Sequence, residues 1–422
     1  MFSNIFVSLI KLQVKNSSVE KSHTIRTLFL TVIAEVISFG ILIPIVPLFF
    51  TEPSSQFFLL PEALSVETGY ILLGVLLGLY PLGQFFATPI LGEISDIYGR
   101  KKVIQISITG TIFSTLIFAY GIMAASIPVL FISRIINGLT GGLIAVAQAT
   151  IADVTDNDNK SKNFGIIGAA FGTGFILGPF LGGFLSSDFS QFFTATTPFF
   201  FAAGLSTLSL FYSRFKLEET SPMEEKSINW KKPFTQLKKG LNIPGLKKLF
   251  GANFFYFSGF AFFTTFIPVY LVKQFSFNQF QTGNFFLYIG VLLIFGQGYL
   301  VPKVFSRYRE EVVMPITLFF TGFFIFLQPV PQALIPFMAA VTLFSINNSL
   351  TQVSLNTLVS NKASEKDQGL ALGTNQSVRA LANAVPSMIS GVSAAVFTPA
   401  MPLSIAGGLI MVTAVVYKLI EG

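Results

Sequence analysis

The stretch GEISDIYGRKK, residues 92–102, separates two long apolar segments near residues 69–91 and 103–124. Each segment has about 20 residues, which at about 1.5 Å per helical residue spans a hydrocarbon layer of about 30 Å. The stretch between them is short and carries charges of both signs. A charged loop between two such segments indicates helices that cross a membrane and turn at its surface.

Apolar segments of this kind recur along the whole chain. Hydrophobic residues make up 52% of the sequence and charged residues 11%, against roughly 25% charged residues in soluble domains. We therefore predict an all-α membrane protein with twelve transmembrane helices. These are expected near residues 27–50, 69–91, 103–124, 128–152, 164–186, 196–213, 249–272, 282–302, 312–329, 333–358, 369–392 and 399–419.

The positions of the basic residues predict the orientation of these helices. If both termini are cytoplasmic, all but three of the 27 Lys and Arg residues lie in the tails and cytoplasmic loops, where basic residues concentrate. The three are Arg134 and Arg379, inside spans, and Lys273, at an outer helix end. Because the basic residues lie between spans and form no patch, the net charge of +7 does not indicate a nucleic-acid partner.

The longest polar insertion, residues 214–248, divides the chain into two six-helix bundles, residues 27–213 and 249–422. Weak similarity between the halves predicts a pseudo-symmetric pair. Residues 1–26 lack a cleavage pattern and are interpreted as a retained cytoplasmic tail. The insertion is either a solvated linker, which we favour, or a regulatory or partner site at the membrane surface.

The composition argues against several chemistries. The chain has no cysteine and one histidine, His23, so disulfides, thiolate metal sites and histidine metal sites are excluded. No catalytic constellation or sizeable polar domain is visible. We expect neither an enzyme nor a bound metal or cofactor.

The loop that joins the second and third spans resembles the signature loop of the major facilitator superfamily. The matching residues are Gly92, Asp96, Gly99, Arg100 and Lys101. The glycines permit a close approach of the loop to neighbouring helices, Asp96 is able to accept hydrogen bonds, and Arg100 is able to pair with acids on an adjoining helix end. We expect this charge cluster to act as a gating loop.

The fifth span, GIIGAAFGTGFILGPFLGG, resembles the antiporter signature of drug:proton exchangers in this superfamily. The small residues and the proline that carry the resemblance are Gly165, Gly174, Gly178, Pro179, Gly182 and Gly183. Small residues let a neighbouring backbone approach closely, and a proline bends a helix. The alternative is ordinary packing of small residues in a helix bundle.

Glu35 is the candidate proton carrier. It lies in the first span nine residues before Pro44, where tetracycline-efflux-like exporters, which this span resembles, usually carry Asp. An acid kept inside the membrane is by default functional. The resemblance implies that Arg134, in a fourth-span signature with Gly138, tunes this acid. The alternatives for Glu35 are an acid at a wet helix end and an acid paired permanently with a base, and the alternative for Arg134 is a purely structural arginine.

Polar side chains in other spans are candidates for lining the substrate cavity. Asn348, Gln352 and Asn356 recur every four residues and share one helix face, and Gln376 and Arg379 lie in the eleventh span. Gln84 is a further candidate in the second span. The alternative for each is a hydrogen bond between helices.

The sequence thus predicts a major-facilitator-like secondary transporter in a bacterial inner membrane, embedded in lipid and functional as a monomer. The preferred hypothesis is a proton-coupled exporter of drugs or small metabolites that works by alternating access. The alternative is a transporter of an endogenous solute such as a siderophore, carboxylate or amino acid, favoured by the two intramembrane arginines.

Overall fold

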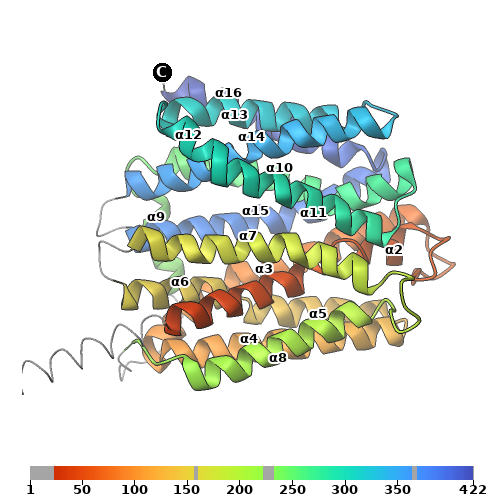
Figure 1. The fold of residues 1–422 in the computed structure, drawn as a ribbon, viewed down its shortest axis with the longest axis horizontal. Coiled ribbons are helices and arrows are strands. Elements are labelled where there is room, and N and C mark those ends of the chain that lie inside the picture. The colour runs from red at the N-terminus through yellow and green to blue at the C-terminus, as the bar shows by residue number, and fades with distance from the viewer. Residues whose placement is uncertain (1–22, 156–159, 222–231, 364–367, 422) are drawn as a thin grey trace, which may run out of the picture.

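The computed structural model describes residues 23–155, 160–221, 232–363 and 368–421. Within these ranges the chain forms long helices that run side by side (Figure 1), and it contains no β-strand. Ten of the described helices are long and apolar enough to cross a membrane.

The helices before the linker lie in the lower part of Figure 1, with α7 nearest the upper group. They are the first helix (His23–Gly40), α2 (Val46–Thr51), α3 (Val66–Tyr98), α4 (Arg100–Met123), α5 (Ile127–Thr140), α6 (Leu143–Val154), α7 (Lys160–Leu185) and α8 (Thr197–Lys216).

A short helix and a second group of long helices follow. They are α9 (Lys232–Leu241), α10 (Lys247–Phe275), α11 (Gln279–Phe295), the π-helix η2 (Gly296–Leu300), α12 (Val301–Phe305), α13 (Glu310–Leu327), α14 (Leu334–Lys362), α15 (Gln368–Val396) and α16 (Met401–Glu421). The first helix begins, and α16 ends, at the same end of the bundle as α9, which we call the linker end; the opposite end is the α2 end.

The first span is interrupted, whereas the sequence predicted one helix over residues 27–50. The helix ends at Gly40, and turns lead to α2. Pro44 has no N–H to donate to Gly40, and the Gly40 carbonyl instead accepts from the Ile43 amide at 3.1 Å. Pro44 therefore leaves a tighter i to i−3 hydrogen bond in place of the helical i to i−4 bond, and this turn separates the first helix from α2.

The predicted fourth and eighth spans are also irregular. Gly141 and Gly142 separate α5 from α6, and the Gln84 side chain donates to the Gly141 carbonyl at 2.9 Å. The π-helix η2 lies between α11 and α12. Glycine tolerates such irregularities because it lacks a Cβ. The residues at these interruptions do not change the overall hydropathy of the span.

Two predicted spans, α8 and α15, are not among the ten apolar candidates, although both run alongside the others (Figure 1). In α15 the polar residues Asn375, Gln376, Arg379 and Asn383 lower the hydropathy. The first helix begins by His23, inside the predicted tail, and α9 lies inside the predicted linker. The predicted tail is otherwise outside the described residues.

The helices before and after the linker meet along two seams, α3 against α15 and α7 against α11. Both seams are closest toward the α2 end. A Cβ on Gly74 would lie 2.6 Å from the Ser387 carbonyl oxygen, and a Cβ on Gly183 would lie 2.3 Å from the Gln279 carbonyl oxygen. Nearer the linker end, a Cβ on Gly92, Gly165 or Gly373 would meet nothing within 4 Å.

Candidate functional site

Glu35 is enclosed by helices at the middle of the first group. Its side chain is 7% exposed, and its Oε2 atom accepts a hydrogen bond of 2.7 Å from the Thr111 hydroxyl on α4. Thr111 is itself 1% exposed. The carboxyl group therefore lies in a site with one close hydroxyl donor among the described residues and with little access to water.

Arg134 on α5 is also buried, with 3% of its surface exposed. Its guanidinium lies over the Phe118 ring, 5.0 Å from the ring centroid, and interacts electrostatically with Glu35 and Tyr80. Arg134 and Glu35, which both lie in the described part of the chain, do not form a close ion pair. The Nε atom of Arg134 has no hydrogen-bond partner among the described residues.

Serine and asparagine side chains continue this buried polar region between α4 and α5. The Asn137 amide donates to the Ser114 hydroxyl at 2.7 Å, and the Ser133 hydroxyl donates to the Ser114 carbonyl at 2.7 Å. These bonds occupy polar groups on both sides of Arg134. They hold the two helices in register beside the candidate proton carrier.

A second polar cluster lies among α10, α14 and α15. Arg379 donates to the Asn356 side-chain carbonyl, and its guanidinium stacks on Phe257 at 4.3 Å from the ring centroid. The Tyr256 hydroxyl donates to the Asn348 side-chain oxygen at 2.5 Å, and Gln352 lies within hydrogen-bonding reach of the same hydroxyl. The structure thus brings together four of the six predicted cavity residues.

The other two predicted cavity residues lie elsewhere. Gln84 on α3 donates to the Tyr80 hydroxyl at 3.3 Å as well as to Gly141, so its amide serves contacts within the first group. Gln376 lies on α15, half-buried, three residues before Arg379. The described residues contain no group of three or more side chains suited to hold a metal ion.

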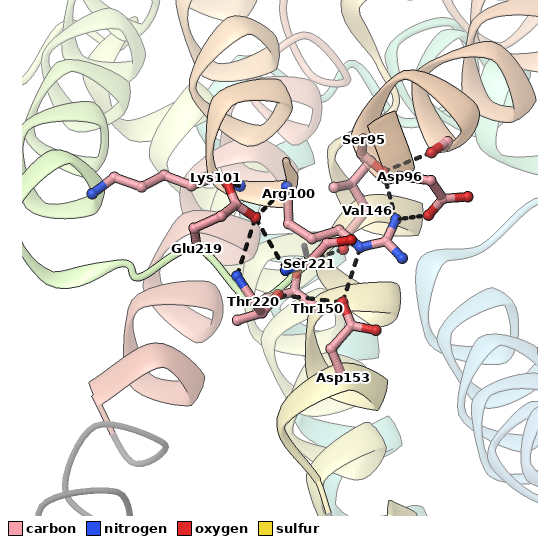
Figure 2. Close-up of polar contacts among 11 residues, drawn as sticks. Ser95, Asp96, Arg100, Lys101, Val146, Thr150, Asp153, Glu219, Thr220 and Ser221 are labelled. Carbon is pink, nitrogen blue, oxygen red and sulfur yellow. Dashed lines mark hydrogen bonds and ion pairs between the residues drawn. The ribbon is translucent and has the colours of Figure 1, made fainter. Parts of the chain in front are cut away.

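Figure 2 shows the loop that the sequence singled out as a gate. Arg100 pairs with Asp96 at 2.6 Å and with Asp153 at the end of α6 at 3.0 Å. It also donates to the Ser95 hydroxyl at 2.6 Å. The Arg100 side chain is only 11% exposed, so this network ties the ends of α3, α4 and α6 together.

Glu219, just after α8, caps the first turn of α4 (Figure 2). Its carboxylate accepts from the Arg100 amide at 2.6 Å and from the Lys101 amide at 3.2 Å. These amides would otherwise lack partners at a helix N-terminus, where negative charge is also favourable. Gly99 has φ +98°, and a Cβ there would lie 2.2 Å from Glu219, so glycine is required for the cap.

The glycines of the fifth span have two kinds of neighbour. Gly174 and Gly178 face the first helix, Gly182 faces Ile41 just after it, and a Cβ on Gly178 would lie 2.8 Å from the Gly40 Cα atom. Pro179 also contacts Gly40, while Gly183 faces α11 across the seam. Gly165 has open space around it. One face of α7 in the predicted motif therefore packs against the helix that carries Glu35, and another face contacts the second group of helices.

The sequence profile described as "Major Facilitator Superfamily" matches residues 28–387. This chain belongs to the major facilitator superfamily. It is a multi-pass membrane protein of the MFS transporter class.

Curated relatives of this MFS chain include named resistance proteins. It is 29% identical over 310 residues to the class H tetracycline resistance protein of Pasteurella multocida, covering 70% of each chain. It is 35% identical over 199 residues to the class E protein of Escherichia coli, covering 47% of this chain and 45% of that one. With multidrug resistance protein 2 of Bacillus subtilis it shares 24% identity over 377 residues, 87% of this chain and 88% of the relative.

Solved structures of other MFS transporters share its fold. The human organic anion transporter MFSD10 gives a TM-score of 0.71 at 20% identity and covers 94% of this chain and 99% of that one. A D-xylose-proton symporter gives a TM-score of 0.73 at 16% identity, covering 93% and 97%. The similar solved chains are transporters, which are not enzymes.

Sequence reasoning missed several residues of these MFS clusters. Thr111, Tyr256 and Phe257 are ordinary residues of apolar spans, so nothing in their spacing distinguished them. Glu219 was visible as one of several acids at the start of the linker, but its position at the α4 N-terminus depends on how α8 ends. The sequence did contain one signal for this cap. Gly99 is followed by a helix that begins with basic residues, and the first amides of such a helix need a capping acceptor.

Proposed function

We propose that the chain forms twelve transmembrane helices in two six-helix bundles, residues 27–213 and 249–422, joined by a cytoplasmic linker, residues 214–248. The start of the first helix and the end of α16 share the linker end of the bundle, which fits an even number of spans. The basic residues support a cytoplasmic location for this end, and we infer that the membrane is the inner membrane of a bacterium. The protein functions as a monomer.

We further propose that the protein is a proton-coupled exporter of drugs or small metabolites. The observation that carries this proposal is the Glu35 carboxyl, 7% exposed and hydrogen-bonded to Thr111 at 2.7 Å. A carboxyl in a water-poor site is costly to ionise, so its charge state responds to changes in its surroundings. Tetracycline resistance and multidrug resistance relatives support the export direction.

Alternating access couples the proton to the cargo. A carboxylate at Glu35 is stabilised by the nearby charge of Arg134, and a protonated carboxyl is not. Rocking of the two bundles would change the distance between Glu35 and Arg134 or the access of water to Glu35. Proton binding to Glu35 then favours either the inward-open or the outward-open state. With the linker end in the cytoplasm, the α2 end is the outer side. Because both seams are closest at the α2 end, we interpret this structure as a state closed on the outer side.

The test uses Glu35→Gln in proteoliposomes. The variant keeps the shape of the side chain but cannot release a proton, so transport driven by a pH gradient is expected to fall to background while substrate binding persists. Glu62→Gln, in the exposed segment between α2 and α3, serves as the matched control and should retain most transport. Gradient-driven transport by Glu35→Gln at the wild-type rate contradicts the proposal.

A second candidate function is transport of an endogenous solute such as a carboxylate, amino acid or siderophore. It is favoured by Arg134 and Arg379, which both lie in predicted spans. Glu35 is the one acid in the predicted spans that could balance their two charges. Arginine keeps its charge inside a protein and needs an acceptor or an anion nearby. Retention of endogenous metabolites in cells that lack the protein distinguishes this candidate from drug export.

A further inference from the structure

Arg379 lies near the middle of α15. It is the twelfth residue of the helix Gln368–Val396, about 16 Å from the helix start at about 1.5 Å per residue. It therefore lies at a depth where a fixed positive charge is expensive unless neutralised.

No acid in the described part of the second group lies at this depth. After residue 248 the sequence contains five acids, Glu310, Glu311, Glu365, Asp367 and Glu421. The first two open α13, the next two precede α15 and the last ends α16. Glu35 lies in the first group, beside Thr111 and Arg134. The charge of Arg379 thus has no carboxylate counter-ion among the described residues of its own bundle.

The contacts of Arg379 leave donors of the guanidinium unused. One face of the guanidinium lies on Phe257, and one amino group donates to Asn356. The Nε atom is enclosed and has no partner among the described residues. An arginine offers five N–H donors in a planar fork, and Nε with its neighbouring amino group matches the two oxygens of a carboxylate.

Tyr256 interacts electrostatically with Arg379 and connects it to a second unpaired donor and to apolar surface. The Asn348 Nδ2 atom is likewise buried without a partner in the described chain. Tyr256 stacks on Phe260, with ring centroids 6.3 Å apart, and Phe260 lies 6.4 Å from Phe175 on α7. A row of aromatic rings therefore leads from Tyr256, next to the unpaired Asn348 amide, to Phe175 in the first group of helices. The cluster complements an apolar molecule that carries one planar anionic group.

We propose that Arg379 and the residues around it, Tyr256, Phe257, Asn348, Gln352 and Asn356, form the binding site for cargo with an apolar body and a single carboxylate. The Arg379 edge binds the carboxylate, and the aromatic rings contact the body. This inference rests on the proposed transport function and names its cargo class. One fixed positive charge matches one negative charge, so a dianion would leave an uncompensated charge in the site.

The experiment measures equilibrium binding to purified protein without any proton gradient. Two matched pairs serve as probes, 2-naphthoate with 2-naphthamide and octanoate with octanamide, because each pair differs in charge and little in shape. Wild-type protein is expected to prefer at least one carboxylate over its amide by about tenfold, a difference of about 1.4 kcal/mol. Equal affinity within both pairs, or no carboxylate binding, overturns the proposal.

Three variants locate the preference. Arg379→Gln should reduce it to less than about threefold, below roughly 0.7 kcal/mol, whereas Asn383→Ala, one turn further along α15, should retain it. Arg379→Lys keeps the charge without the fork and should give an intermediate value. If Arg379→Gln does not fold, Asn356→Ala should weaken carboxylate binding selectively. A preference that survives both Arg379→Gln and Asn356→Ala overturns the proposal.

Glu35→Gln separates this inference from the proposed proton coupling. The variant should bind the carboxylate probe as wild type does while losing gradient-driven transport. Loss of the carboxylate preference in Arg379→Gln, together with normal gradient-driven transport in Glu35→Gln, would support the binding site and refute the coupling. Uniform loss of all four probes in Arg379→Gln indicates a structural role and overturns the site.

Discussion

At the scale of single residues, the arginines Arg134 and Arg379 have different surroundings, and Arg134 is buried whereas Arg379 is partly exposed. Arg134 lies over an aromatic ring within electrostatic reach of an acid. Arg379 stacks on a ring too, but its closest polar partner is the amide Asn356. These different surroundings support the proposed coupling role of Arg134 and the proposed cargo-binding role of Arg379.

Glu219 provides a residue-scale prediction. Glu219→Ala removes the acceptor for the Arg100 and Lys101 amides, and loss of an N-terminal cap costs about 0.5–2 kcal/mol. Amide hydrogen exchange at residues 100 and 101 should accelerate by several-fold, while Glu218→Ala, the exposed neighbour, should leave it unchanged. Equal exchange in both variants would show that the carboxylate does not cap α4 in solution.

The sequence marks a candidate site residue most clearly when that residue carries a charge. Glu35, Arg134 and Arg379 stand out because ionisable groups are rare in apolar spans. Tyr256 and Thr111 do not stand out, because hydroxyl-bearing residues are common there. Their importance arises only from the side chains opposite them, Asn348 and Glu35.

At the scale of elements, close approach of α7 to the first helix depends on glycine. Gly178 and Gly40 face each other, and Pro179 lies beside them. This contact fixes the helix that carries Glu35 against the fifth span. Ordinary side chains at these positions would push the two helices apart.

Gly178→Ala and Gly172→Ala form a matched pair on the same helix. A Cβ at Gly178 would lie 2.8 Å from the Gly40 Cα atom, whereas a Cβ at Gly172 would meet nothing within 4 Å. Gly178→Ala should destabilise the protein by about 1–3 kcal/mol. Gly172→Ala should be neutral or stabilise it by up to about 1 kcal/mol. Unfolding in detergent measures both, and similar stabilities would contradict the packing.

Helix interruptions were the least predictable property of the elements. Hydropathy located the spans because an apolar run of sufficient length needs no partner to be recognised. It could not locate the end of the first helix at Gly40 or the gap at Gly141 and Gly142, because these residues are as apolar as their neighbours. The gap is stabilised by Gln84, from a different helix.

At the scale of the whole molecule, the two groups of helices are held together mainly toward the α2 end. The glycine contacts of the two seams lie there, and Lys273 on α10 pairs with Glu52 after α2 at 2.9 Å. The side chains of this pair are 35% and 21% exposed. The pair is therefore a contact between the two groups that water can reach.

Lys273→Gln is expected to favour opening at the α2 end. A partly exposed ion pair contributes up to about 1 kcal/mol, so opening should increase by at most about fivefold. A cysteine at Ser387, buried in the α3–α15 seam, reports opening through its rate of maleimide labelling, with no background because the chain has no other cysteine.

The charge-reversed pair Glu52→Lys with Lys273→Glu is the control for this measurement. It restores an attraction between the same positions, so labelling should return to the rate of the parent protein with cysteine at Ser387. If the reversed pair labels as fast as Lys273→Gln, the ion pair does not hold the α2 end closed.

The sequence by itself determined the class of this protein. The lengths of the apolar runs, the basic loops and the spacing in residues 92–102 indicated a transporter fold, because hydrophobic thickness and loop charge act locally along the chain. The tertiary structure decided which polar side chains meet. Arg379 with Phe257 and Asn356, and Glu219 with the first turn of α4, come from segments far apart in sequence, and only helix packing brings their atoms within bonding distance.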